Sequence, residues 1–345
     1  MKNHQTFGQE YHGDEIAVVG MALRVPGANT PEDFWALLQA GLNPYDDVTD
    51  EQMQAHGIDP GLYQQSHYVR RSISLDKVTA FDPGFFGFSA LDAALMDPQY
   101  RHFLELAWEA FEHAGEKVDA LKGSTGVYAG SGQNTYLIHH LARNPKLTDN
   151  PGHWYLRHVG NDKDFMTTRV SYHLNLEGPS INVQTACSTS LVATHLACQS
   201  LISRECDYAL AGGVTIAFPH GCGYLAPEGG IEDPRGECRS FDATSKGTIF
   251  SSGGGVILLK RLEDALKHNN TIYGVIRASA VNNDGSTKAS FTAPSVDGQV
   301  KVISEALDLG EINPESIGYV EAHGTGTPIG DPIELNALKE VLSNK

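Results

Sequence analysis

The chain has 345 residues, 41% of them apolar, and is therefore long enough to bury a sizeable core in one large domain or in two packed halves. Lys and Arg total 25 against 42 Asp and Glu, and the formal net charge of -17 excludes a broad electrostatic attraction to nucleic acid. No window approaches the ~18 apolar residues of a membrane span, and residues 1 to 15 lack the basic flank and apolar centre of a secretory signal, so we expect a cytoplasmic protein that does not enter a membrane.

The first segments predict an α/β protein. Residues 1 to 13 are polar, and we expect them to be flexible. An apolar, β-branched run over residues 15 to 27, closed by Gly and Pro, predicts a buried strand, and "TPEDFWALLQAG" at 30 to 41 predicts a helix with a Thr N-cap and Pro at its first position. An amphipathic helix over 97 to 115 and a strand over 124 to 131 continue the pattern.

The alternation of strands and helices extends along the rest of the chain. Further strands are predicted at 179 to 186, 207 to 218, 253 to 262, 271 to 284 and 316 to 323. Further helices are predicted at 188 to 206, 262 to 269, 297 to 310 and 331 to 342. Because apolar strands that alternate with helices are covered on both faces, the sequence predicts a layered α/β/α arrangement.

The cysteines form no disulfide or zinc pattern. The chain has five cysteines, an odd number, and none of them belongs to a Cys-x-x-Cys pair. We therefore expect reduced thiols and no metal site. Four are expected to be small buried hydrophobic residues: Cys198, Cys206, Cys222 and Cys238. Cys187, in "QTACSTSLV", differs because it lies where a predicted strand passes into a predicted helix. The free amides and the dipole at a helix N-terminus favour a thiolate, which makes Cys187 a candidate nucleophile.

The neighbours of Cys187 suit acyl transfer. The same helix-end amides can receive an oxyanion, and Ala186, Ser188 and Ser190 are small enough to let a substrate carbonyl approach. The turn follows the logic of a nucleophile elbow, although it lacks the glycines of the Gly-x-Ser-x-Gly motif.

A histidine in "GYVEAHGTGTPIGDPIE" is the candidate partner of the thiol. The sequence predicts His323 at the end of a strand, followed by a loop in which Gly324 allows close approach of neighbouring backbone and Thr325 and Thr327 present hydroxyls. Ligands of α/β sheets bind beyond the carboxyl ends of strands, so we expect Cys187 and His323 to share one site. The alternative, a histidine that only caps a glycine-rich turn, stays open.

Several long stretches carry a resemblance to a known family. They are "FDPGFFGFSALDAALMDPQYRHFLELAWEAFEHAG" (81 to 115), "VQTACSTSLVATHLACQSL" (183 to 201), "RSFDATSKGTIFSSGGGVILLKRLEDAL" (239 to 266) and "VEAHGTGTPIGDPIE" (320 to 334). In this order they resemble the β-ketoacyl synthase domain of modular type I polyketide synthases. The opening "EIAVVGMALRVPGANTPEDFW" also matches the start of that domain, so the resemblance spans residues 14 to 345.

The resemblance implies a thiolase-like fold, layered α/β/α/β/α with two pseudo-symmetric halves, and a homodimer. We expect the N-terminal half at 14 to 262 and part of the C-terminal half at 263 to 345. Family members continue past "HGTGT" to a Lys, a second catalytic His in an Asn-x-Gly-His motif and a Gly-Phe-Gly loop, whereas this sequence ends at "LKEVLSNK". We therefore expect an incomplete second half and a chain that is condensation-deficient alone, or that is complemented by a partner chain carrying the missing part.

The resemblance also implies a mechanism. Cys187 accepts an acyl chain as a thioester from an acyl carrier protein, and a malonyl-type extender on a carrier protein then loses carbon dioxide and attacks that thioester in a Claisen condensation. His323 matches the first catalytic histidine, which stabilises the oxyanion of the decarboxylating extender, and Thr325 and Thr327 match threonines that bind the phosphopantetheine arm. The chain itself is expected to bind no cofactor, because the partner carries the phosphopantetheine. The expected residues of the oxyanion and active-site loops are Ala186, Ser188 and Gly324.

Two features narrow the match and leave alternatives. Gln184 stands where the family often has Asp, a variant reminiscent of synthases in hybrid peptide-polyketide lines. The cysteine is retained, unlike in loading-module relatives where glutamine replaces it, and "HGTGT" argues against a degradative thiolase. A fatty-acid ketosynthase and a non-elongating ketosynthase-like module that binds acyl groups or carrier proteins stay open as alternatives.

Overall fold

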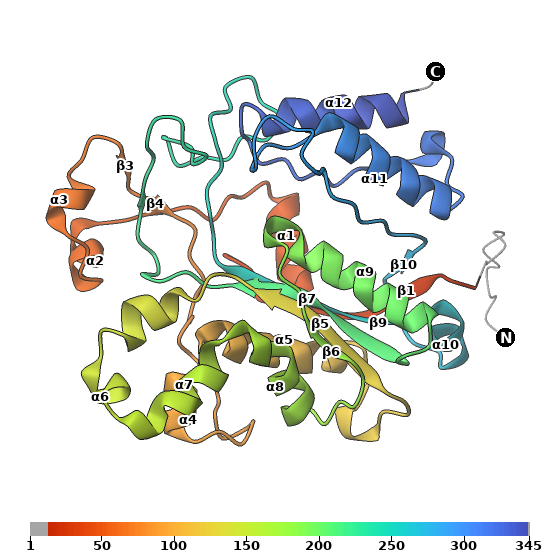
Figure 1. Cartoon of the computed structure of the whole chain (residues 1–345), viewed down its shortest axis with the longest axis horizontal. Helices are drawn as coiled ribbons and strands as arrows, with labels where there is room; N and C mark the ends of the chain where they lie inside the picture. Colours follow the sequence, from red (N-terminus) through yellow and green to blue (C-terminus); the bar gives the residue numbers. More distant parts are fainter. Residues whose placement is uncertain (1–12, 344–345) are drawn as a thin grey trace.

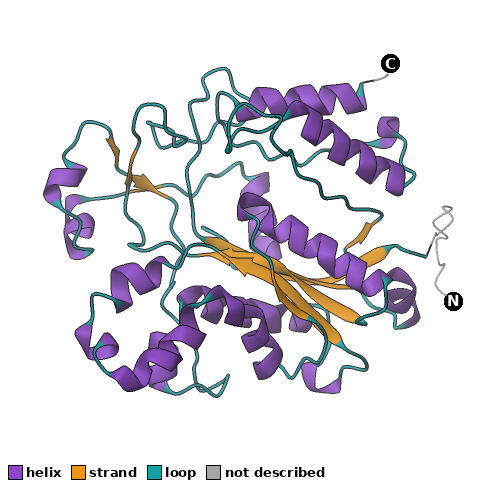
Figure 2. Cartoon of the chain, viewed as in Figure 1, coloured by secondary structure: helices purple, strands orange, loops and turns teal. Residues whose placement is uncertain are grey.

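The computed structural model describes residues 13–343 and contains a six-stranded mixed sheet with helices on both faces (Figures 1 and 2). Its strands are β1 (Ile16–Arg24), β5 (Thr125–Ser131), β6 (Ser180–Asn182), β7 (Tyr208–Thr215), β9 (Gly253–Arg261) and β10 (Gly274–Ile276). They are arranged in the order β10-β1-β9-β7-β5-β6, in which β5 is parallel to both β6 and β7 and the other neighbours are antiparallel. Two small sheets pair β2 (Asp46–Asp47) with β4 (Arg71–Ser72) and β3 (Tyr68–Val69) with β8 (Tyr224–Leu225).

Helices cover both faces of the large sheet. Helices α5 (Pro98–His113) and α8 (Met166–His173) cover one face, and α9 (Thr189–Ile202) covers the other (Figure 1). The remaining helices are α1 (Pro31–Gln39), α2 (Asp50–Ala55), α3 (Pro60–Tyr63), α4 (Ala90–Leu95), α6 (Pro145–Thr148), α7 (Trp154–Asn161), α10 (Leu262–Lys267), α11 (Val296–Leu309) and α12 (Gly330–Leu342). The predicted α/β/α layering is thereby confirmed. No helix in the described part of the chain is both long and apolar enough to cross a membrane.

Apolar side chains on both faces explain why the central strands are buried. In β5, Val127 and Ala129 pack into the core under α5, whereas Tyr128 packs into the core under α9. In β7, Leu210 faces the α5 side and Ala209 the α9 side. Alternate residues of a strand point to opposite faces, so an almost continuous apolar run supplies both cores.

The start of α1 follows the predicted chemistry. Thr30 caps α1 with its side-chain oxygen, which accepts the Asp33 N–H at 3.1 Å, and Pro31 is the first helical residue. The α5 helix starts in the same way, with Asp97 accepting the Gln99 N–H at 2.9 Å before Pro98. These caps satisfy amides that have no partner inside the helix.

The last two predicted strands are largely wrong. Only 274–276 of the strand expected at 271 to 284 forms, and the strand expected at 316 to 323 is a loop that follows the 3₁₀ turn Pro314–Ser316. A strand requires a neighbour that pairs with its backbone, and no described residue forms such a ladder with this loop, where Tyr319 is 78% exposed. Within residues 13–343 the C-terminal part therefore contributes β10, α11 and α12 but no second large sheet.

Two predictions concern the N-terminal segment and the boundary between the two halves. The flexible N-terminus expected over 1 to 13 lies outside the described residues apart from Gly13. The boundary expected between 262 and 263 falls at the start of α10 and stays a prediction.

Candidate active site

Cys187 lies at the turn between β6 and α9, where the sequence predicts it. The chain leaves the sheet as the Val183 N–H donates to the carbonyl of Ala129 at 2.9 Å. A 3₁₀ turn, Ala186–Ser188, then leads into α9, and Cys187 is exposed. The thiol therefore stands at the N-terminal end of a 14-residue helix, where free amides stabilise negative charge.

Hydroxyl side chains hold this turn in an unusual conformation. Ala186 has a φ of 55°, in the left-handed region that costs a non-glycine residue roughly 1–2 kcal/mol. The Ser188 hydroxyl donates to the carbonyl of Thr185 at 2.9 Å, and the Thr189 hydroxyl accepts the Thr185 N–H at 3.0 Å. The small hydroxylated residues beside Cys187 thus stabilise the shape of the turn.

Cys187 lines a cavity of about 930 Å³ at one edge of the sheet. The walls are the last residues of β5 and β7, the first residues of β9, residues 21–23 in the second half of β1, the first turns of α9, and the residues Lys163 and Gln184. The parallel strands β5, β6 and β7 end at this edge, which is where ligands of α/β sheets bind. The volume is within the range of cavities that hold an extended organic ligand.

Glycine is required where the Cys187 turn approaches the sheet. A Cβ at Gly130 in β5 would lie 1.9 Å from the carbonyl oxygen of Val183 and 2.5 Å from a methyl carbon of Thr189. At Gly213 in β7, which also lines the cavity, the nearest atom to an added Cβ would be 3.4 Å away. Only the first glycine is therefore needed for the close approach.

A buried polar pair, Asp97 and Gln99, contacts the chain where it leaves the end of β7. The Gln99 side chain donates to Asp97 at 2.9 Å and accepts the N–H of Ile216, just after β7, at 3.3 Å. Asp97 is buried, and burial raises the pKa of its carboxyl to about 6, although hydrogen bonds from Gln99 and the charges of Arg101 and Lys163 act in the opposite direction. In the sequence, Asp97 stands out only as part of a helix start.

Lys163 is a second residue that sequence reasoning missed. Its ammonium donates to the carbonyl of Ser131 at 3.0 Å and to the side-chain oxygen of Gln184 at 2.9 Å. Lys163 is far from Gln184 in the sequence, so no local pattern indicates this contact.

The loop that contains His323 is built around two carboxylates. Glu334 in α12 accepts the backbone N–H of His323 at 2.6 Å and that of Gly324 at 2.9 Å. The hydroxyls of Thr325 and Thr327 are hydrogen-bonded at 2.9 Å. His323 thus lies in a loop and not at a strand end, because the strand expected before it does not form.

The second carboxylate joins this loop to residues 238–245. Asp331 is buried and accepts the N–H of Phe241 at 2.6 Å and the N–H of Gly326 at 2.9 Å. The Ser240 hydroxyl also donates to the carbonyl of Gly324. Asp331 and Glu334 stand in the same sequence motif as His323, but only the structure shows what they bind.

The structure brings part of the predicted site together. Ala186 and Cys187 line the cavity, whereas Ser188 bonds within its own turn. No residue from 323 to 327 lines the cavity, and within residues 13–343 no hydrogen bond joins that loop to the Cys187 turn. The segment that leads into α12 lies on the same side of the sheet as α9 (Figure 1).

The other cysteines differ from Cys187. Cys198 and Cys206 are buried, as predicted, and burial raises the pKa of the Cys198 thiol to about 12 and also raises that of Cys206. Cys222 and Cys238 are only half-buried, since both lie in loops. Across the described residues, no group of three or more His, Cys, Asp or Glu side chains could hold a metal ion.

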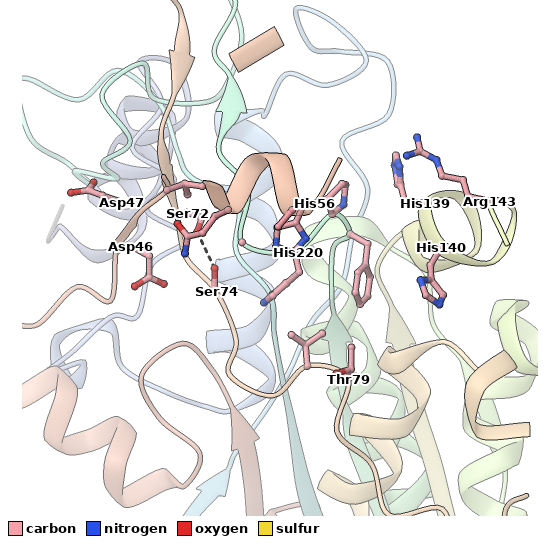
Figure 3. Close-up of a pocket in the computed structure, with 17 residues that line it drawn as sticks. Asp46, Asp47, His56, Ser72, Ser74, Thr79, His139, His140, Arg143 and His220 are labelled. Carbon is pink, nitrogen blue, oxygen red and sulfur yellow. Dashed lines mark hydrogen bonds between the residues drawn. The ribbon is translucent and has the colours of Figure 1, made fainter. Parts of the chain in front are cut away.

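A second cavity, of about 720 Å³, shares no lining residue with the first. Figure 3 shows His139 beside Arg143 on one side of it and Asp46 and Asp47 on the other. His220 lies between them, with its Nε2 atom 3.0 Å from the backbone oxygen of Leu75. This cavity contains no cysteine and none of the candidate residues predicted from the sequence.

Comparisons with known proteins cover almost the whole chain. A family model described as "Beta-ketoacyl synthase, N-terminal domain" matches residues 13–265, and one described as "Beta-ketoacyl synthase, C-terminal domain" matches residues 273–345. One of the phenolphthiocerol/phthiocerol polyketide synthase polypeptides of Mycobacterium tuberculosis is 46% identical over 94% of the chain. Polyketide synthase PksN of Bacillus subtilis is 39% identical over 96% of the chain.

Solved structures with the same fold include ketosynthases. Ketosynthase twelve of the bacillaene polyketide synthase of Bacillus amyloliquefaciens matches with a TM-score of 0.89 and 37% identity over 96% of the chain. An oxazolomycin ketosynthase domain of Streptomyces albus matches with a TM-score of 0.81 and 32% identity, also over 96% of the chain. The chain spans 22% of the mycobacterial polypeptide, 6% of PksN, and 58% and 56% of the two solved chains.

Proposed function

The chain belongs to the β-ketoacyl synthase family and has its thiolase-like fold, and from this premise we propose that Cys187 accepts an acyl chain as a thioester during polyketide assembly. The observation that carries the proposal is the exposed Cys187 thiol at the N-terminus of α9, where Cys187 lines a cavity of about 930 Å³. The named relatives and solved neighbours, which are polyketide synthases, favour this pathway over fatty-acid synthesis.

Acylation would proceed by thioester exchange. The Cys187 thiolate attacks the carbonyl carbon of an acyl group held on the phosphopantetheine thiol of an acyl carrier protein. The new bond joins carbon to the Cys187 sulfur, the bond to the carrier sulfur breaks, and the released thiolate takes up a proton. Amides at the start of α9 and in the turn can stabilise the negative oxygen of the tetrahedral intermediate.

Condensation would follow with a malonyl-type extender. The extender loses carbon dioxide, and the resulting enolate carbon attacks the acyl carbonyl, so that a carbon–carbon bond forms and the bond to the Cys187 sulfur breaks. We assign to His323 the stabilisation of the enolate oxygen, and to Thr325 and Thr327 hydrogen bonds to the phosphopantetheine arm. Ala186, Ser188 and Gly324 complete the proposed site. These roles require the loop at 323–327 to reach the Cys187 cavity, which it does not line in this structure.

The proposed partners are an acyl carrier protein and a second copy of the chain. An acyl carrier protein supplies the phosphopantetheine, so the chain needs no bound cofactor of its own. A homodimer is supported by β6, which among the described residues pairs only with β5 and leaves the side chain of Ile181 exposed. Analytical ultracentrifugation of the chain tests the dimer directly.

A second candidate is a non-elongating module that takes up acyl groups without condensing them. The separation of His323, Thr325 and Thr327 from the Cys187 cavity favours it. Incubation of the acylated chain with a malonyl carrier protein discriminates the two functions. A β-ketoacyl product supports the synthase, whereas stable acyl-Cys187 with no product supports the non-elongating module.

The acyl-accepting role is tested by mass spectrometry. Incubation with the N-acetylcysteamine thioester of a short acyl acid should add the mass of one acyl group to the chain, and the Cys187→Ala variant should gain none. An unmodified wild-type chain, with its thiols shown to be reduced, would contradict the proposal.

A further inference from the structure

The hydrogen bond between Lys163 and Gln184 gives the lysine a role that extends beyond the nucleophile itself. We propose that Lys163 is a positioning residue that fastens the Cys187 turn to the end of β5 by bonding Gln184 and Ser131 at once. The inference rests on the proposed acyl-accepting role of Cys187.

The turn needs an anchor because its conformation is unfavourable. Ala186 is held at a φ of 55°, and residues 184 to 188 are all exposed, so packing contributes little to holding them. The bonds made by Thr185, Ser188 and Thr189 lie within the turn and would move with it. Among residues 13–343, the bond from Lys163 is the only hydrogen bond that ties residues 184 to 189 to a distant part of the chain.

Lys163 is itself well placed to act as an anchor. It lies at the start of the short 3₁₀ turn Lys163–Phe165, directly before α8. The Asn182 side chain, at the end of β6, donates to the carbonyl of Asp164 at 2.9 Å and to the hydroxyl of Thr167 at 3.0 Å. The residues that follow Lys163 are therefore bonded to the end of β6, and the Lys163 ammonium links this segment to the Cys187 turn.

Gln184 suits this contact because it is a neutral acceptor. Its side-chain oxygen accepts from the ammonium at 2.9 Å, and a hydrogen bond with one charged partner is stronger than one between neutral groups. In the sequence, Gln184 stands out only as a departure from the aspartate common in the family. In the structure, Gln184 is the residue of the Cys187 turn that accepts the hydrogen bond from Lys163.

The test compares two single substitutions, their combination and two controls. Lys163→Met and Gln184→Met each remove the bond, while Gln184→Met leaves the positive charge beside the cavity in place. Lys163→Arg keeps a cationic donor. Lys288→Met removes a lysine whose side chain is 21% exposed, pairs with Asp284 at 3.8 Å and does not line the Cys187 cavity. Because Gln184 is exposed, Gln184→Met should keep the fold, which thermal unfolding of each variant checks.

Two rates are measured on the full chain: acylation of Cys187 by an N-acetylcysteamine thioester and alkylation of Cys187 by iodoacetamide. We expect each single Met variant to slow both rates by about tenfold, the factor that matches the loss of one hydrogen bond to a charged group. The double variant should be no slower than either single variant, because both remove the same bond. Lys163→Arg should keep most of the wild-type rate, and Lys288→Met should leave it unchanged. Amide hydrogen exchange in the peptide over 184 to 190 should rise in the two Met variants and in their combination, but not in Lys163→Arg or Lys288→Met.

The outcomes separate the two proposals. If Gln184→Met reacts within twofold of wild type while Lys163→Met is slow, the lysine acts through its charge and the positioning role is overturned. Multiplicative losses in the double variant would also overturn it. If no acylation of the wild type occurs but the alkylation rates follow the expected pattern, the positioning role stands and the proposed acyl-accepting function fails.

Discussion

Gly130→Ala is expected to force the Cys187 turn away from the sheet. The added Cβ would lie 1.9 Å from the Val183 carbonyl oxygen, a backbone atom that cannot rotate out of the way. Val183 is also held by the hydrogen bond from its N–H to the Ala129 carbonyl at 2.9 Å, so β5 and the segment after β6 must separate. Overpacking of this kind lowers the free energy of unfolding by about 1–3 kcal/mol. Replacing Gly by Ala also reduces the conformational entropy of the unfolded chain, which offsets less than about 1 kcal/mol of this loss. We expect a net loss of about 2 kcal/mol in the free energy of unfolding.

Gly213→Ala is the matched control. It places the same methyl group in the adjacent strand and the same cavity, but the nearest atom would be 3.4 Å away, which is an ordinary contact. Urea denaturation followed by fluorescence gives the stability of both variants, and iodoacetamide alkylation of Cys187 reports the geometry of the turn. Gly130→Ala should lose both stability and alkylation rate, while Gly213→Ala should keep both. Equal behaviour of the two variants would refute the inference that close approach to β5 shapes the turn.

Three further predictions concern Asp97, Ala186 in the Cys187 turn, and Glu334 beside the His323 loop. Burial raises the pKa of Asp97 to about 6 from 3.8, so its contribution to stability is complete below about pH 4 and is lost as the pH rises through 6. The free energy of unfolding of Asp97→Asn should therefore exceed that of the wild type by up to ~3 kcal/mol at pH 8 and match it near pH 4. Urea denaturation at the two pH values measures this difference. A difference that does not change with pH would contradict the prediction. Ala186→Val should cost about 2 kcal/mol, because a β-branched residue tolerates the left-handed conformation poorly, whereas Ala186→Gly should be close to neutral in the same assay. Glu334→Ala removes the acceptor of the His323 and Gly324 amides, so hydrogen exchange at these two amides should accelerate; unchanged protection would show that other contacts hold the loop.

Much of the sheet can be predicted from local patterns. The runs of β1, β5, β7 and β9 consist largely of apolar and small residues, and the burial of both their faces follows from the helices between them. The helix starts at Thr30 and Asp97 combine an N-cap with a following proline, which is a signal within three residues. The position of Cys187 between a strand and a helix is predictable for the same reason.

What sequence reasoning missed depends on distant contacts. The strand expected at 316 to 323 has a suitable composition but no pairing neighbour among the described residues, and composition does not supply one. Lys163 meets Gln184 across 21 positions, and the carboxylate of Asp331 meets the Phe241 amide across 90. Such contacts are set by the packing of separate elements, so no local pattern assigns a role to Lys163 or Asp331.

Site-resolved acyl transfer tests the central claim most directly. The wild-type chain is incubated with a limiting amount of a short acyl thioester, and peptide mass spectrometry compares acyl occupancy at Cys187 with that at the half-buried Cys222 and Cys238. We expect the acyl group on Cys187 and essentially none on the other two thiols. Equal occupancy of the three cysteines, or acylation that persists undiminished in the Cys187→Ala variant, would contradict the claim that this turn carries the nucleophile.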